Sequence, residues 1–255
     1  MTEREIRAMT AQMNDLHAET FPRLREAMDD LGSGLRRRLR EDGGFSRRGF
    51  LLGGGALAGA VALGACGSSK SPSPLASSSS PAVGDVAALA TNASLENLAV
   101  FAYGAALADA PKGKFGAKVP AAIAEFATHA KAQHTDHANA FNAALRNAGA
   151  APFTDPDPAL AKDVTAMYAK VTTLGGLATL ALTLENTAAA TYTMQLGSLT
   201  SAEALAAAAT IAPVERQHAA VLSYVLGDYP VPDSFVPLGA TATSLGARPS
   251  TDAGR

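Results

Sequence analysis

Two stretches of this 255-residue chain nearly repeat, and each places a glutamate in an apolar segment. Both read Leu-Glu-Asn-x-Ala-x-x-x-Tyr, and each is followed by a second segment that carries histidine. The residues of these four segments that could do chemistry are Glu96, His134, His137, Glu185, Glu215 and His218. Carboxylates and imidazoles together bind transition metals such as iron, zinc and copper. The pattern therefore predicts a metal site shared by two pairs of segments.

Helical spacing places these residues on shared faces. A helix advances about 100° per residue, so residues three apart lie on one side of it. His134 and His137 meet this condition, and so do Glu215 and His218. The same count turns three further polar residues away from the site: Glu125, His129 and Asp136.

The surroundings of Glu96 and Glu185 are apolar, and an ionised carboxylate is costly to bury unless it is paired or bound to a metal. Taken singly, either glutamate is more simply explained as an exposed helix residue, and each histidine as a surface residue. The combined order and spacing favours the metal site. Tyr103 and Tyr192 lie seven residues after the two glutamates and therefore on the same helix faces. Their expected role is to hydrogen-bond the ligands or to carry an electron, and the alternative is packing in the core.

The elements that must position these residues are helices. The region from 86 to 228 is rich in Ala and Leu and shows little of the alternation typical of strands, so we expect an all-α fold. Pro213 lies inside the last expected helix and predicts a kink or a restart just before Glu215. The expected helices are 86–109, 119–148, 174–199 and 202–226, with a short extra helix at 159–171.

The front of the chain resembles a bacterial export signal. Ser46-Arg47-Arg48-Gly49-Phe50-Leu51 resembles the twin-arginine pattern, and the apolar run after it is too short and too rich in Gly and Ala for a good membrane span. The run ends in Leu63-Gly64-Ala65-Cys66, which resembles a lipobox. We therefore expect passage through the twin-arginine machinery, lipidation at Cys66 and anchoring to the outer face of the cytoplasmic membrane. The alternative for Cys66 is a buried free thiol.

These signals divide the chain into five parts. The n-region before the twin arginines is long and polar, with apolar residues spaced as in an amphipathic helix (Leu16, Phe21, Leu24, Met28 and Leu31), and we expect it in the cytoplasm. A Ser- and Pro-rich stretch cannot bury apolar surface and is expected to be a flexible tether. The parts are the n-region 1–45, the signal 46–66, the tether 67–85, the helical domain 86–228, and a Pro-rich, then disordered tail 229–255.

Composition excludes several function classes. The formal net charge of −2 offers no large field for a nucleic-acid partner, and a single cysteine permits neither an internal disulfide nor a thiolate metal cluster. No nucleotide or flavin motif is visible, and the sequence leaves the oligomeric state open.

Residues 182–192 and 214–220 resemble the ferritin-like superfamily, and specifically its bacterial branch that includes desiccation-associated proteins. The resemblance implies an antiparallel four-helix bundle. It makes Glu96 and Glu185 the single-carboxylate ligands and Glu215 with His218 a Glu-x-x-His pair. His137 matches the histidine of the other pair, and His134 stands where that pair's bridging glutamate is expected.

The resemblance implies a metal-binding protein, with a di-iron oxidase, a ferroxidase or protection against oxidative stress as the activities to consider. Iron is the expected metal, as a pair or as a single ion, with zinc or manganese as alternatives. The replacement by His134 leaves three carboxylates and shifts the preference toward zinc, copper or one iron. A metal-free bundle that acts as a structural or interaction module in envelope stress remains the alternative, and whether the protein is an enzyme stays open.

Overall fold

The computed structural model describes residues 2–41, 81–116, 118–231 and 238, and these residues form helices and the loops between them. This confirms the prediction of an all-α fold. The helices are α1 (Glu3–Glu41), α3 (Pro81–Asp109), the 3-10 turn η1 (Ala110–Lys112), α4 (Ala121–Ala148), α5 (Pro158–Ala169), α6 (Leu174–Gln195) and α7 (Ala202–Leu226).

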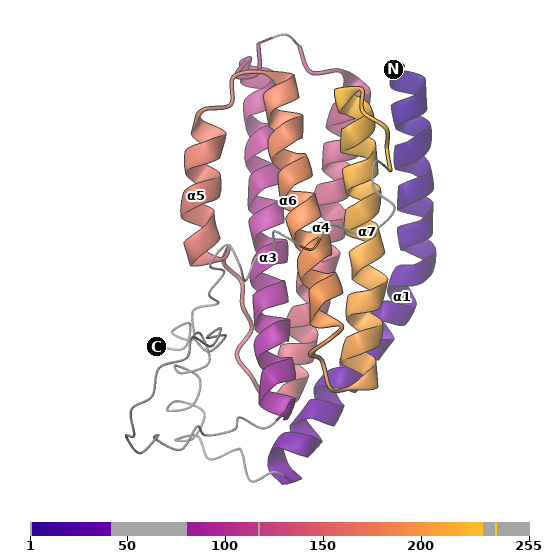
Figure 1. The fold of residues 1–255 in the computed structure, drawn as a ribbon, viewed down its shortest axis with the longest axis vertical. Helices are drawn as coiled ribbons and strands as arrows, with labels where there is room; N and C mark the ends of the chain where they lie inside the picture. The colour runs from indigo at the N-terminus through magenta and orange to yellow at the C-terminus, as the bar shows by residue number, and fades with distance from the viewer. Residues whose placement is uncertain (1, 42–80, 117, 232–237, 239–255) are drawn as a thin grey trace, which may run out of the picture.

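The long helices pack side by side into one bundle (Figure 1). The most extensive packing joins α1 to α4, α3 to α4 and α6 to α7, whereas α3 and α6 meet at far fewer points. The short helix α5 lies against α3 and α6, and α1 runs along the other side against α4 and α7. The interior between α3, α4, α6 and α7 is the space in which the candidate ligands lie.

Most helix ends follow the signals in the sequence. Ser201 precedes α7, and its hydroxyl oxygen accepts a hydrogen bond from the backbone N–H of Ala204. Gly149 and Gly227 end α4 and α7 with φ of 85° and 86°, a conformation that glycine adopts without strain. The expected extra helix is α5, and the buried carboxylate of Asp157 caps its first turn.

Helix α6 ends at Gln195, before the expected 199, and two further features of the helices differ from the prediction. Helix α3 begins at Pro81, earlier than expected, because Asp85 is anchored in the structure: its carboxylate accepts hydrogen bonds from the backbone N–H groups of Thr200 and Ser201, at 3.0 and 3.1 Å. Helix α7 does not restart at Pro213 but continues through it. Pro213 and Ala209, whose carbonyl loses its helical partner there, are both exposed, so water can satisfy that carbonyl.

The N-terminal helix α1 is a further member of the bundle, a position that the sequence did not predict. The side chains of Met28, Leu31 and Leu35 are at most 1% exposed, and they form one core with residues of α3, α4 and α7. Leu16, expected on this apolar face, is 40% exposed, and His17 takes the inward position instead. The cytoplasmic location expected for this segment stays a prediction, and it is compatible with this packing only while the domain lies on the same side of the membrane.

Glycine allows α1 to approach α4 closely. A Cβ atom added to Gly32 would lie 2.4 Å from the carbonyl oxygen of Ala144 and 2.5 Å from Cβ of Asn147. Polar contacts hold the helix near its start and in its second half, because Arg7 pairs with Glu125 at 3.1 Å and the side-chain amide of Asn147 donates to Asp29 at 3.0 Å. Residues 2–41 therefore pack as an integral part of the fold.

The export signal 46–66, residues 67–80 of the tether and nearly all of the tail lie outside the described residues. Among the helices that are described, none is both long enough and apolar enough to cross a bilayer.

We predict that Gly32→Ala destabilises the full-length protein by about 1–3 kcal/mol, because the added methyl group overlaps the α4 backbone. Gly34→Ala is the matched control in the same helix, since its Cβ meets only the Arg37 guanidinium at 3.9 Å. The control should be neutral or stabilising by roughly 0.5–1 kcal/mol. Urea unfolding of both variants measures the difference, and equal stabilities would contradict the close approach of α1 to α4.

Candidate metal centre

The structure brings together all six residues that the sequence proposed as ligands. Each of the four interior helices contributes at least one of them, and every one of these residues is at most 2% exposed. Helix α3 provides Glu96, α4 provides His134 and His137, α6 provides Glu185, and α7 provides Glu215 and His218. Cys66, the proposed lipidation site, lies outside the described residues.

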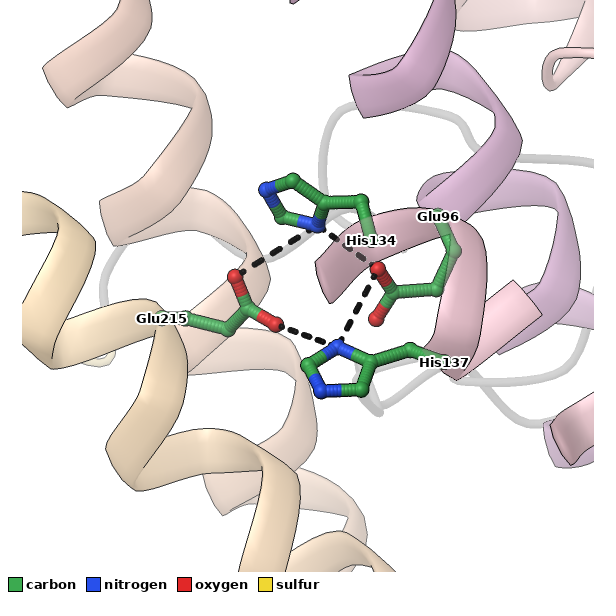
Figure 2. Close-up of side chains that lie close together, drawn as sticks. All are labelled: Glu96, His134, His137 and Glu215. Carbon is green, nitrogen blue, oxygen red and sulfur yellow. Dashed lines mark hydrogen bonds and ion pairs between the residues drawn. The ribbon is translucent and has the colours of Figure 1, made fainter. Parts of the chain in front are cut away.

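One half of the centre joins α3, α4 and α7 (Figure 2). Nδ1 of His134 lies 2.7 Å from Oε2 of Glu96 and 3.8 Å from Oε2 of Glu215. Nδ1 of His137 lies 3.6 Å from the same oxygen of Glu96 and 3.4 Å from Oε1 of Glu215. The four side chains therefore surround one small volume with alternating oxygen and nitrogen atoms.

The other half joins α4, α6 and α7. Nε2 of His134 lies 3.3 Å from Oε1 of Glu185, and Nδ1 of His218 lies 3.3 Å from Oε2 of Glu185 and 3.5 Å from Oε2 of Glu215. In each half, four residues offer ligand atoms that all lie within 4.8 Å of one another. This spread suits metal–ligand bonds of about 2.0–2.2 Å. Because the halves share His134 and Glu215, they form one continuous centre.

The carboxylate of Glu215 is the most unusual group in the interior. Its side chain is 0% exposed, and neither of its oxygens accepts a hydrogen bond. Buried carboxylates are normally hydrogen-bonded or bound to a metal, because desolvation of the bare group is costly. Nδ1 of His137, which faces Glu215, also lacks a hydrogen-bond partner. These carboxylate oxygens and this imidazole nitrogen are atoms of the kind that bind a metal ion.

Comparison with known proteins agrees with this arrangement. Residues 84–228, more than half of the chain, match a family described as ferritin-like domain. The chain belongs to this family. No curated protein and no solved structure matches the chain significantly.

Two tyrosines of the ferritin-like domain link its halves crosswise. The hydroxyl of Tyr103 donates a hydrogen bond to Oε1 of Glu185 at 2.6 Å, and the hydroxyl of Tyr192 donates one to Oε1 of Glu96. Each tyrosine thus orients the glutamate of the other repeat. Both are buried, and burial together with the neighbouring carboxylates raises their pKa well above the ordinary value. They therefore stay protonated and act as donors.

Gln133 is a site residue that the sequence did not point out. Its Oε1 lies 2.8 Å from Nε2 of His218, so this ring nitrogen donates to Gln133 and Nδ1 is directed toward Glu185 and Glu215. Without its proton, Nδ1 would offer a lone pair to a metal ion there. Metal-binding histidines usually donate their second ring nitrogen in this way. No sequence signal marked Gln133, because its role depends on a partner 85 residues away.

His17 of α1 is a second residue that the sequence did not point out. Its ring lies 5.3 Å from that of His137 and stacks on Phe21 at 4.9 Å, so α1 covers this side of the centre. Burial, and next the neighbouring His137, lower the pKa of His17 to about 4, so the ring is neutral. Its Nε2 is buried without a hydrogen-bond partner.

The residues that helical spacing turned away lie outside the cluster. Glu125 is on the surface and pairs with Arg7 of α1 rather than with His129. His129 and Asp136 are only partly buried and belong to neither group of candidate ligands.

The carboxylates and imidazoles of the centre shift one another's pKa strongly. Burial alone raises the pKa of Glu96, but His137 and His134 outweigh it and hold the value at about 2. Burial lowers the pKa of His137, but Glu96 and Glu215 outweigh it and raise the value to about 9. In the same way the pKa of Glu185 falls well below its ordinary value and that of His134 rises well above it. The metal-free cluster is therefore a set of ion pairs.

We predict that this cluster stabilises the metal-free protein most between pH 4.5 and 6.5. The pKa of Glu96 falls from 4.5 to about 2, so its contribution is lost as the pH falls through 2. The pKa of His137 rises from 6.5 to about 9, so its contribution is present below 6.5 and lost as the pH rises through 9. Urea unfolding of chelator-treated protein across this range measures both losses.

Bound metal provides the control for this prediction. A metal ion replaces the imidazole protons, so the loss on the alkaline side should disappear when metal is present. A metal-free stability that rises steadily from pH 6.5 to 9 would contradict the prediction.

Proposed function

We propose that this protein binds a transition metal within an antiparallel four-helix core made by α3, α4, α6 and α7. The observation that carries the proposal is the buried carboxylate of Glu215, which has no hydrogen-bond donor and faces imidazole nitrogens from two helices. His218 supports it further, because Gln133 orients its ring with Nδ1 toward the carboxylates. A purely structural polar core would be expected to pair the oxygens of Glu215 with donors.

The ligands of the proposed centre are Glu96, His134, His137, Glu185, Glu215 and His218. Three carboxylates and three neutral imidazoles leave a net charge near zero with one or two divalent ions. Two trivalent ions would leave three positive charges uncompensated in a low-dielectric interior. The donor set therefore favours one or two divalent ions, with iron as the first candidate and zinc or manganese as alternatives.

Iron in this centre would supply one-electron and oxygen chemistry, as an oxidase or ferroxidase that protects against oxidative stress. The chain's own residues would orient the ligands through the crosswise tyrosines and shield the centre from water. Because His134 replaces a carboxylate, the proposal commits to metal binding and leaves turnover to be measured.

We predict that the full-length protein binds iron, zinc or manganese and that binding raises its melting temperature. Glu215→Gln should remove most of this increase, because the variant loses the carboxylate common to both halves of the centre. Glu203→Gln, an exposed residue in the first turn of the same helix, is the matched control and should retain it. Metal analysis of the purified proteins and calorimetry with added metal make the measurement.

The outcome also decides between this proposal and its alternative. If neither the wild type nor Glu203→Gln takes up metal or responds to it in melting, the metal proposal fails. The six residues would then be an ion-paired polar core, and the domain a structural or interaction module of the cell envelope.

We further propose that the protein is exported through the twin-arginine pathway and anchored by a lipid on Cys66. The support is the sequence Ser46 to Leu51, the apolar run and the lipobox-like end, in that order. Helix α1 precedes this signal, so cleavage before Cys66 would leave α1 attached to the domain by non-covalent contacts only.

Exchange of Arg47 and Arg48 for Lys should strand the protein in the cytoplasm, and Cys66→Ala should leave it unprocessed or free of the membrane. Cell fractionation with immunodetection of residues 2–41 and of the domain makes the measurement. Unchanged fractionation of both variants would refute the assignment.

A further inference from the structure

An apolar pocket lies beside the metal centre, on the side away from α1. It is lined by residues of α3, α4, α5, α6 and α7, it has a cavity volume of about 90 Å³, and it opens to the surface. His134 and Glu185 are part of its wall, so the pocket reaches the centre directly.

Small side chains create this space. Ala99, Ala102 and Ala106 follow one face of α3 at helical spacing, and Ala178 and Ala181 belong to the wall that α6 contributes. Alanine can let helices approach closely, but α3 and α6 meet at few points. The methyl groups therefore leave a space between the two helices, which larger residues would fill.

The polar groups of the pocket wall are already paired. The hydroxyl of Tyr103 donates to Glu185, that of Tyr168 donates to Asp109 at 3.0 Å, and that of Thr187 donates to the carbonyl of Thr183 at 2.8 Å. The rest of the wall is aliphatic or aromatic, with Leu98, Phe126 and Leu222 among its members. A ligand would therefore meet apolar surface everywhere except at the metal centre.

The pocket is also long. Its wall on α3 extends from Leu95 to Ala106, about 16 Å at 1.5 Å per residue. A compact polar molecule would fill this space poorly and would leave its own polar groups unpaired.

We propose that this pocket binds an alkyl chain and holds it next to the metal centre. The part of this inference that concerns the metal rests on the proposed function, whereas the binding of the chain does not, since the apolar wall exists independently of any ion. A hydrocarbon chain matches the wall in polarity and in length.

The test uses the full-length protein and N-phenyl-1-naphthylamine, an uncharged dye whose emission rises in apolar surroundings. The wild type should bind the dye, and 1-decanol should displace it. Ala102→Leu and Ala181→Leu fill the pocket and should each weaken dye binding by about tenfold, a loss of about 1.4 kcal/mol. Ala108→Leu, an exposed site on the same α3 helix, is the matched control and should bind as the wild type does.

Two further measurements separate the possible outcomes. Far-ultraviolet circular dichroism and thermal melting check that the leucine variants are folded. The dye affinity of the more stable of the two variants is the one compared with the control. No dye binding by the wild type, or equal binding by the filled variants and the control, overturns the proposal.

The link to the metal is tested separately by the absorption spectrum of Co²⁺-loaded protein. Addition of 1-decanol should shift this spectrum in the wild type and not in Ala102→Leu. If the protein takes up no Co²⁺ but still binds the dye, the proposed metal function fails and the alkyl site stands. If Co²⁺ binds and its spectrum ignores 1-decanol, the chain does not lie next to the metal and this part of the inference is wrong.

Discussion

Burial of three carboxylates among three imidazoles is the constraint on which the rest of this structure depends. Each charged group would be costly in a helical interior, and it is tolerated because groups of opposite charge face it from neighbouring helices. The four interior helices must therefore hold their mutual positions closely. Tyr103 and Tyr192 help to do so, since each fixes a glutamate of the other repeat. Glu215 differs in one respect, because imidazoles face it but neither of its oxygens accepts a hydrogen bond, at the point where both halves of the centre meet.

The two sides of the centre are built differently. On the side of α1, tight packing closes the interior: Gly32 lets that helix touch the α4 backbone, and the His17 ring lies over His137. On the side of α3 and α6, alanines keep the helices apart and leave an apolar space that reaches Glu185. A buried centre with one covered side and one apolar approach would admit apolar molecules and small uncharged ones more easily than ions.

The packing of helix α1 bears on the proposed export of the protein. It contributes buried residues to two of the core clusters of the bundle, yet it precedes the twin-arginine sequence. Twin-arginine export carries folded proteins, so α1 can pack on the domain before transport. Processing at Cys66 would then leave the helix held by its packing, by the pair of Arg7 with Glu125 and by the hydrogen bond of Tyr224 to Glu5.

The sequence by itself determined the helices and the six candidate ligands. Periodicity shows which residues share a face of one helix, so it united His134 with His137 and Glu215 with His218, and it turned Glu125 away. It cannot show which helix faces another, because that depends on contacts between residues far apart in the chain. Only the tertiary structure therefore decided that α1 joins the bundle, that His17 rather than Leu16 points inward, and that Gln133 orients His218. The same reason holds for α7, where the exposure of Pro213, set by packing, lets the helix continue where its sequence alone predicted a kink or a restart.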